Sequence, residues 1–293
     1  MAKSALLKSS IVKKYWMALT GLFLCLFLVG HLAGNLQLIF GTSKQFNEYA
    51  LFMTTNPAVK LLSYLTYISI IFHAIDGIML TIQNKKARPV GYAKTDGSSS
   101  SLASRNMAVL GTVILVFIAT HMVNFWAKMH FDKNMPLVVK EMDNGMGIKQ
   151  VQIVGTKDSP MPFLGAKNER TITAAFIKDV KEQTQGKYDL ELKNGTTLIN
   201  KVDGEIVFIG FKDLHKLTVD FFRDAKLGLV FTIGYVLAML ALAFHLWHGF
   251  QSAFQSLGIN NKFTPSIKFF GRAFAIIVPL LFAIIPIILH FKK

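Results

Sequence analysis

Cysteine is almost absent from this chain, and its scarcity excludes several kinds of site. Cys25 is the only cysteine among 293 residues, and it lies within an apolar run. Disulfides, cysteine-ligated zinc clusters and thiolate-bound iron–sulfur centres within the chain are therefore excluded. The chain has no Cys-x-x-Cys-His sequence, which excludes covalently attached c-type haem. We interpret Cys25 as a small buried hydrophobic residue.

Acidic residues are scarce outside one block in the middle of the chain. Of 17 Asp and Glu residues, 14 lie between Met129 and Leu227, and the others are Glu48, Asp76 and Asp96. The rest of the chain has 17 basic and 3 acidic residues, a net charge of +14. These cations flank apolar segments, which is typical of membrane anchoring, so we expect a lipid bilayer and no nucleic acid as partner.

Five apolar runs are long enough to cross the hydrocarbon core of a bilayer, which is about 30 Å thick. They cover about 15–40, 59–83, 106–128, 225–253 and 267–291. The first run is too long for a signal peptide and has no cleavage site after it. Lysines precede it, and the loop after the second run is the most basic short loop. The positive-inside rule then places the N-terminus inside and the C-terminus outside.

The sequence accordingly predicts an all-α membrane bundle with one inserted segment. Residues 1–128 hold the first three helices, with a short loop at 41–58, and residues 225–293 hold the last two. Residues 129–224 form the insertion, where Tyr188–Lys193 and part of Lys201–Phe208 alternate with period two around Asn194-Gly195. We expect a small, β-rich subdomain on the outer side. Its last piece, Asp213–Arg223, has helical spacing and either lies on the membrane surface or extends the fourth helix.

Four histidines lie in four different apolar runs, at two matched depths. An ionisable side chain at membrane depth costs about 2.5–3.5 kcal/mol, so each is a functional-site hypothesis. At 1.5 Å per residue, His31 and His121 each lie roughly 24 Å from the inner face. From the outer face, His73 lies roughly 20 Å in and His245 roughly 28 Å in, so both are nearer the inner face. Each pair comes from two helices, as bis-histidine ligation of a haem iron across a bundle requires.

Two features near these histidines have alternative interpretations. His248 lies one helical turn from His245 and is the alternative ligand, but one helix face does not easily offer both to one iron. Gly77 and Gly249 each follow an inner-pair histidine by four residues, and Gly111 precedes an outer-pair histidine. Glycines there would let a flat macrocycle approach the backbone. They are also common helix-packing residues in membranes.

These segments resemble one known family, the cytochrome b membrane subunit of succinate dehydrogenase and fumarate reductase, of the single-chain, five-helix, two-haem type. The segments that carry the resemblance are the basic N-terminus, Gly30-His31-Leu32 with Asn35, His73-Ala74-x-x-Gly77, Thr120-His121 and Phe244-His245-x-x-x-Gly249. The stretch 245–258 is similar to the branch found in Bacteroidetes. The resemblance covers the five helices, about 195 residues, and does not cover the insertion.

The resemblance implies two haem b groups and a place in the respiratory chain and the tricarboxylic acid cycle. His73 and His245 would hold the inner, proximal haem iron, and His31 and His121 the outer, distal one. The subunit would lie in the cell's inner (cytoplasmic) membrane and anchor a flavoprotein subunit and an iron–sulfur subunit on the cytoplasmic side. Electrons would pass between the iron–sulfur subunit, the haems and a quinone, here menaquinone. Whether the complex dimerises is left open.

The family also has a quinone site near the distal haem, on the outer side. Residues with polar or amphipathic side chains near that level are Asn35, Gln37, Asn47, Glu48, Asn124 and Trp126. Glu48 is the only acid at the outer ends of the first two helices, so it is our hypothesis for a proton carrier. The alternative is that Glu48 is an ordinary loop residue.

Two rival functions fit a five-helix chain with membrane histidines. One is the dihaem anchor of another quinone-linked dehydrogenase or hydrogenase; a bc-type cytochrome b is disfavoured, because no helix here carries two well-separated histidines. The other is a transporter whose histidines relay protons. It predicts a colourless protein with several buried carboxylates, whereas only Asp76 lies in a helix core.

Overall fold

The computed structural model describes residues 9–87, 90, 101–132, 137–139, 142–143, 149–150, 153–154, 174–193 and 197–292. The chain divides into two compact units. The first unit comprises Met1–Phe40, Thr55–Thr120 and Phe222–Lys293, and the second comprises Gly41–Thr54 and His121–Phe221. The second unit therefore takes in the segment between the first two apolar runs as well as most of the insertion.

Within the described residues, five helices are long and apolar enough to cross a membrane. They are α2 (Ser10–Phe40), α4 (Pro57–Ala87), the continuous run Met107–Phe131, α10 (Gly228–Ser256) and α11 (Thr264–Phe291). This confirms the five predicted helices, and it is the composition of a multi-pass membrane protein. Their bounds differ from the predicted ones by up to five residues.

The third of these helices is not uniform. After the short helix α5 (Leu102–Arg105), the run consists of α6 (Met107–His121), the π-helical segment η1 (Met122–Ala127) and α7 (Lys128–Phe131). The sequence predicted one regular helix over 106–128. A π-helix closes i→i+5 hydrogen bonds, and such segments are frequent at functional sites. Here it begins directly after His121.

The predicted loop at 41–58 is wrong, because most of it forms helix α3 (Ser43–Thr55). A capping box starts this helix: the Thr42 backbone N–H donates to Gln45 Oε1 at 2.9 Å, and the Gln45 N–H donates to Thr42 Oγ1 at 3.2 Å. Asn56 then caps α4, since its Oδ1 accepts a backbone N–H at 2.9 Å. Pro57 takes the first helical position, where its missing N–H is not needed.

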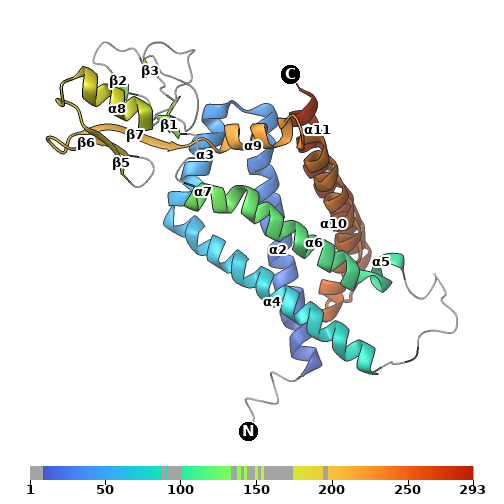
Figure 1. Ribbon diagram of the computed structural model, residues 1–293. Coiled ribbons are helices and arrows are strands. Elements are labelled where there is room, and N and C mark those ends of the chain that lie inside the picture. The colour runs from blue at the N-terminus through green and yellow to red at the C-terminus, as the bar shows by residue number, and fades with distance from the viewer. Residues whose placement is uncertain are drawn as a thin grey trace, which may run out of the picture. The chain divides into compact units, whose positions relative to one another are not determined.

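The core of the first unit lies between α10, α11 and α2, with α4 packed against α2 (Figure 1). Buried apolar residues on α10 and α11 include Leu246, Phe250, Phe274 and Leu289. At Gly271 the two helices approach closely, because a Cβ there would lie 2.5 Å from Phe250 Cδ1. In contrast, α4 and α6 leave most of their apolar side chains exposed, as expected of helix surfaces that face lipid.

Helix α11 continues through two internal prolines to its C-terminal end. Pro279 and Pro286 are both buried. The last turn has carbonyls without intrahelical donors. Arg223 satisfies two of them: its Nε donates to Leu289 O at 2.9 Å, and its Nη2 donates to Lys292 O. His290 Nδ1 lies 2.6 Å from Phe222 O, which ties the same end to the segment before α10.

The described residues of the insertion form short strands and helices, so this part of it is mixed rather than mostly β. The described elements are β1 (Leu137–Val139), β2 (Met142–Asp143), β3 (Lys149–Gln150), β4 (Ile153–Val154), α8 (Ala174–Gln183), β5 (Leu190–Lys193), β6 (Thr197–Asn200), β7 (Ile206–Lys212) and α9 (Leu214–Arg223). The antiparallel pairing of β5 and β6 confirms two strands around Asn194-Gly195, although this dipeptide lies outside the described residues. The strand that pairs with β5 begins at Thr197, whereas the predicted segment 201–208 starts in a turn and ends in strand β7.

Helix α9 does not extend the fourth membrane helix, because a turn at Asp224–Leu227 separates it from α10. Asp213 caps its start, with Oδ1 accepting the Lys216 backbone N–H at 2.8 Å. Buried Asn47 of α3 donates to the same carboxylate at 2.7 Å and accepts the His215 backbone N–H at 2.9 Å. This polar cluster ties α3 to the beginning of α9.

Candidate functional site

His73 on α4 and His245 on α10 lie side by side within the first unit. Their ring centres are 6.2 Å apart, and the ring planes are inclined by 66°. Two imidazoles that share one metal ion through bonds of about 2.0–2.1 Å have ring centres about 6 Å apart, since each centre lies roughly one ångström behind its nitrogen. The structure thus brings together the two histidines of the predicted inner pair, at a spacing that one iron can bridge.

A threonine on α2 orients the ring of His73. Thr20 Oγ1 lies 2.7 Å from the Trp16 carbonyl oxygen, 3.2 Å from the Met17 carbonyl oxygen and 3.3 Å from His73 Nδ1. When the hydroxyl donates its hydrogen to one of these carbonyls, its oxygen acts toward His73 as an acceptor, and the ring proton is on Nδ1. The lone pair is then on Nε2, the nitrogen available to a metal ion.

His245 and His248 differ in how their ring nitrogens are used. His245 Nδ1 is buried and has no hydrogen-bond partner within the described part of the chain. A buried polar atom in this state is uncommon and calls for a physical explanation. His248 Nε2 instead lies 3.1 Å from Ser252 Oγ, one turn along the same helix. This difference favours His245 over its alternative.

Small residues surround the two rings. A Cβ at Gly21 would lie 3.1 Å from His73 Cε1, and a Cβ at Gly111 would lie 3.8 Å from His245 Cε1. Gly111 therefore belongs to the inner level, and its predicted association with His121 is wrong. At Gly77 and Gly249, a Cβ would lie 3.7 Å and 4.0 Å from methionine side chains, those of Met17 and Met107 respectively.

The predicted outer pair is divided between the two units. His31 lies in the first unit, on α2, stacked on Phe27 with ring centres 5.2 Å apart. His121 is the first residue of the C-terminal stretch of the second unit, with its ring centre 5.2 Å from that of Phe125. Because each unit is described by itself, the pairing of His31 with His121 stays a prediction.

The residues predicted for the quinone site likewise lie in both units. Asn35 lies on α2 in the first unit, where its Nδ2 donates to His31 O at 2.7 Å and lies 3.4 Å from His31 Nε2. Glu48 is exposed on α3 in the second unit. Asn124 and Trp126 both lie on the π-helical segment of the second unit, and Trp126 stacks on its neighbour one turn along, His130, at 4.6 Å.

Two further quinone candidates differ in how their side chains are used. Asn47 is 1% exposed, and both polar ends of its side chain make hydrogen bonds within the protein. We therefore assign Asn47 to the structural cluster with Asp213 rather than to a ligand site. Gln37 is half-buried on α2, in the first unit.

The number of side-chain ligands at the inner site fits a metal ion that a macrocycle already holds. In the described ranges, no group of three or more His, Cys, Asp and Glu side chains could hold a metal ion by itself. A haem iron needs only two axial side chains, because the porphyrin supplies the other four nitrogens, and His73 with His245 meets that requirement. No family model, no curated protein and no solved structure was found to match the chain.

Sequence reasoning missed Thr20 and Gly21 as parts of the inner site. Their depth on α2 follows from the sequence, because the helix rises about 1.5 Å per residue. Thr20 lies roughly 8 Å along the helix from Tyr15, and His31 lies roughly 16 Å further on. The signal that could have found them is a polar residue followed by glycine at the depth of the inner pair. It lies on the helix that carries His31. It was not recognised, because only the structure shows which face of α2 meets α4.

Proposed function

We propose that the chain is a dihaem cytochrome b that anchors a succinate:quinone oxidoreductase to the membrane. The observation that carries this proposal is the inner pair, in which His73 and His245 lie 6.2 Å apart between ring centres. The contact of 3.3 Å between Thr20 Oγ1 and His73 Nδ1, which leaves His73 Nε2 for a metal ion, supports it. His31 and His121 are the proposed axial ligands of the second, outer haem.

The protein would contribute ligation, orientation and exclusion of water at the inner site. Haem b, when bound, supplies a one-electron carrier whose iron accepts two neutral imidazoles. Thr20 keeps His73 in the tautomer that ligation needs. Met17 lies next to Gly77, and Met107 lies next to Gly249 together with the His245 ring; methionine side chains are unbranched and adaptable, so they can move aside for a flat ring.

The proposed partners follow from the same assignment. A flavoprotein subunit and an iron–sulfur subunit would dock on the cytoplasmic side of the inner membrane, near the inner site, and menaquinone would react near the outer one. Glu48, Asn35, Asn124 and Trp126 are the proposed quinone-site residues. The alternative is the dihaem anchor of another quinone-linked dehydrogenase or hydrogenase, which would use the same two histidine pairs with different soluble subunits.

The first experiment is the absorption spectrum of the purified protein, with haem counted per chain. We expect a reduced b-type spectrum and two haems. His245→Ala should lose one haem and keep the other, because only the inner iron loses a ligand. His248→Ala is the matched control and should keep both, since it changes the same kind of side chain one turn away. A colourless protein, or equal haem loss in both variants, would contradict the assignment.

A second experiment separates the two dihaem alternatives. Affinity purification from native membranes should bring down a flavin-containing subunit and an iron–sulfur subunit. The complex should also reduce a menaquinone analogue with succinate as electron donor. A complex that contains haem but responds only to hydrogen or formate would support the alternative anchor.

A further inference from the structure

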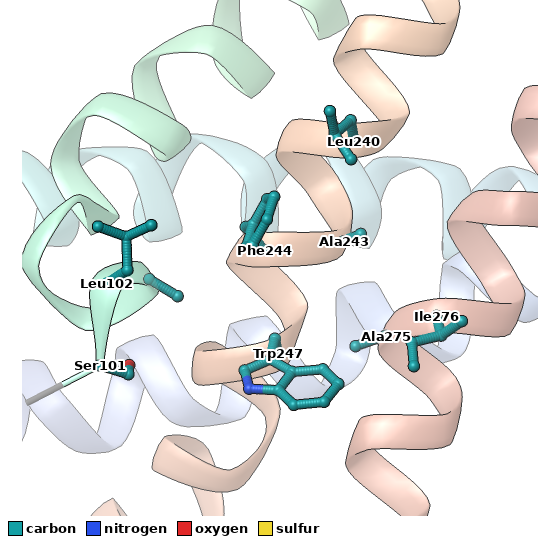
Figure 2. Close-up of a pocket in the computed structure, with 9 residues that line it drawn as sticks. Ser101, Leu102, Leu240, Ala243, Phe244, Trp247, Ala275 and Ile276 are labelled. Carbon is teal, nitrogen blue, oxygen red and sulfur yellow. The ribbon is translucent and has the colours of Figure 1, made fainter. Parts of the chain in front are cut away.

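A groove on the first unit lies between α5, α10 and α11 (Figure 2). Its volume is about 350 Å³, and its lining is apolar except for one serine. Leu240, Phe244 and Trp247 form one wall along α10, while Leu102 and Ala275 contribute from the flanking helices. The serine is Ser101, whose Oγ already accepts the Ser104 backbone N–H at 3.1 Å. The groove therefore fits hydrocarbon rather than a polar ligand.

This groove is distinct from the inner histidine site, although both use α10. His245 and Trp247 are two residues apart, a rotation of about 200° around a helix. Their side chains consequently leave α10 on opposite faces. His245 turns toward His73 of α4, whereas Trp247 and Phe244 turn toward the groove (Figure 2).

Two cations lie at one end of the groove, on α11. The Arg272 guanidinium carbon is 5.6 Å from the centre of the Trp247 ring. Arg272 precedes Ala275 and Ile276 by three and four residues, so the three share one face of α11, and Lys268 lies one turn earlier on that face. Among the described residues, no carboxylate pairs with Arg272 or Lys268.

An exposed arginine within a membrane-spanning helix is costly without an anion. Along α10, the groove runs from Trp247 to Leu240, about 10 Å deeper into the span at 1.5 Å per residue. A ligand that meets both features has an anionic head at Arg272 and an apolar chain beyond it. Guanidinium binds phosphate oxygens in a bidentate manner, and phosphate diesters are the anions that a bilayer supplies.

We infer that this groove binds one anionic phospholipid, with its phosphate at Arg272 and Lys268 and an acyl chain along Phe244 and Leu240. Charge complementarity supports this occupant, because Arg272 and Lys268, which no described carboxylate pairs with, lie beside an apolar groove. The groove is separate from the histidine pair, which lies on the other face of α10. The inference does not depend on the proposed haem function.

Binding of the lipid phosphate at Arg272 is tested by native mass spectrometry of the full chain released from detergent. Phosphatidylglycerol and phosphatidylcholine with identical chains are the probes. We expect wild-type protein to retain phosphatidylglycerol preferentially, and Arg272→Gln to reduce its retention about tenfold while leaving phosphatidylcholine unchanged. Lys226→Gln removes one charge away from the groove and is the matched control, which should bind as wild type does. Equal retention in all proteins would show nonspecific boundary lipid and overturn the inference.

Binding of the acyl chain is tested by filling the groove. Ala243→Phe adds a ring to the groove wall and should lower phosphatidylglycerol retention, whereas Ala108→Phe on exposed α6 should not. Glycerol phosphate, which has no chain, should not compete. A neutral isoprenoid quinone that is retained equally by wild type and Arg272→Gln, and lost in Ala243→Phe, would make the groove a quinone-tail site instead. Loss of bound cofactor in Arg272→Gln would assign the arginine to that cofactor and also overturn the inference.

Discussion

At the scale of single residues, Thr20 shows how a hydroxyl can determine what a histidine is able to bind. It is 8% exposed, and two backbone carbonyl oxygens lie within reach of its hydroxyl hydrogen, so that its lone pairs are left for His73. Neutral imidazole has one donor and one acceptor nitrogen. The threonine therefore leaves Nε2 as the metal-binding atom, and it does so from a different helix than the histidine.

Thr20→Val should weaken the inner haem site while the fold persists, because valine keeps the shape but removes the acceptor. Loss of such a supporting hydrogen bond typically lowers metal affinity about 10–100-fold. The measurement is haem release, followed as absorbance during competition with apomyoglobin. Thr112→Val is the control, since Thr112 Oγ1 bonds only the Ala108 carbonyl oxygen, at 2.8 Å. Equal release rates in the two variants would count against a role for Thr20.

At the scale of helices and strands, the length of an apolar run was enough to predict each membrane helix. A shorter helix with a capping signature was missed. All five long helices could be predicted, since a run of about 20 apolar residues has few other structures in lipid. Helix α3 was missed, although Thr42 and Gln45 carry the capping-box signature, because its 13 residues are not apolar throughout. The π-helical segment could not be predicted, because its residues suit a regular α-helix equally well and only tertiary packing selects between the two.

The candidate site was likewise predictable only in part. Depth along each helix predicted that His73 and His245 share a level, because rise per residue is fixed. Which faces meet is decided by packing, so Thr20, Gly21 and the true neighbour of Gly111 emerged only from the structure. Strand β5 followed from period-two alternation, and the predicted segment 201–208 ends in strand β7, but the strand that pairs with β5 is β6, which was not predicted.

Gly271→Ala should destabilise the α10–α11 pair, because the added Cβ would lie 2.5 Å from Phe250 Cδ1, deep in the ring rather than at a flexible end. Overpacking of this kind costs typically 1–3 kcal/mol. Thermal unfolding in detergent, followed by circular dichroism, should show a lower midpoint. The control is Gly234→Ala on α10, where no atom lies within 4 Å of the added Cβ. A midpoint lowered equally in both variants would refute the packing argument.

At the scale of the whole molecule, the charges predict how the chain crosses the membrane. The excess of +14 lies outside 129–227, around the apolar helices, while the block that holds most of the second unit is nearly neutral. Short basic loops stay on the cytoplasmic side, whereas near-neutral segments are free to be translocated. Residues on either side of the third membrane helix should therefore lie on opposite faces of the bilayer.

Single-cysteine labelling tests this orientation, and the scarcity of cysteine makes it simple. In a Cys25→Ala background, Lys178→Cys should react with a membrane-impermeant maleimide in intact cells. Val90→Cys should react only after lysis. Both sites are accessible in the folded chain, with Val90 76% exposed and the Lys178 side chain 75% exposed. The reverse pattern would invert the topology and move the inner histidine pair to the other face.

The π-helical segment after His121 has a consequence for how the protein can change over time. A π turn holds one residue more than an α turn, so a single inserted codon is enough to create one, and a single deletion is enough to remove it. Deleting one residue of Met122–Ala127 would let the segment return to a regular α-helix, with the faces of α6 and α7 on either side kept in place. Only the side chains within the segment would change their positions. The side chains of Asn124 and Trp126 can therefore change in evolution while His121 keeps its position.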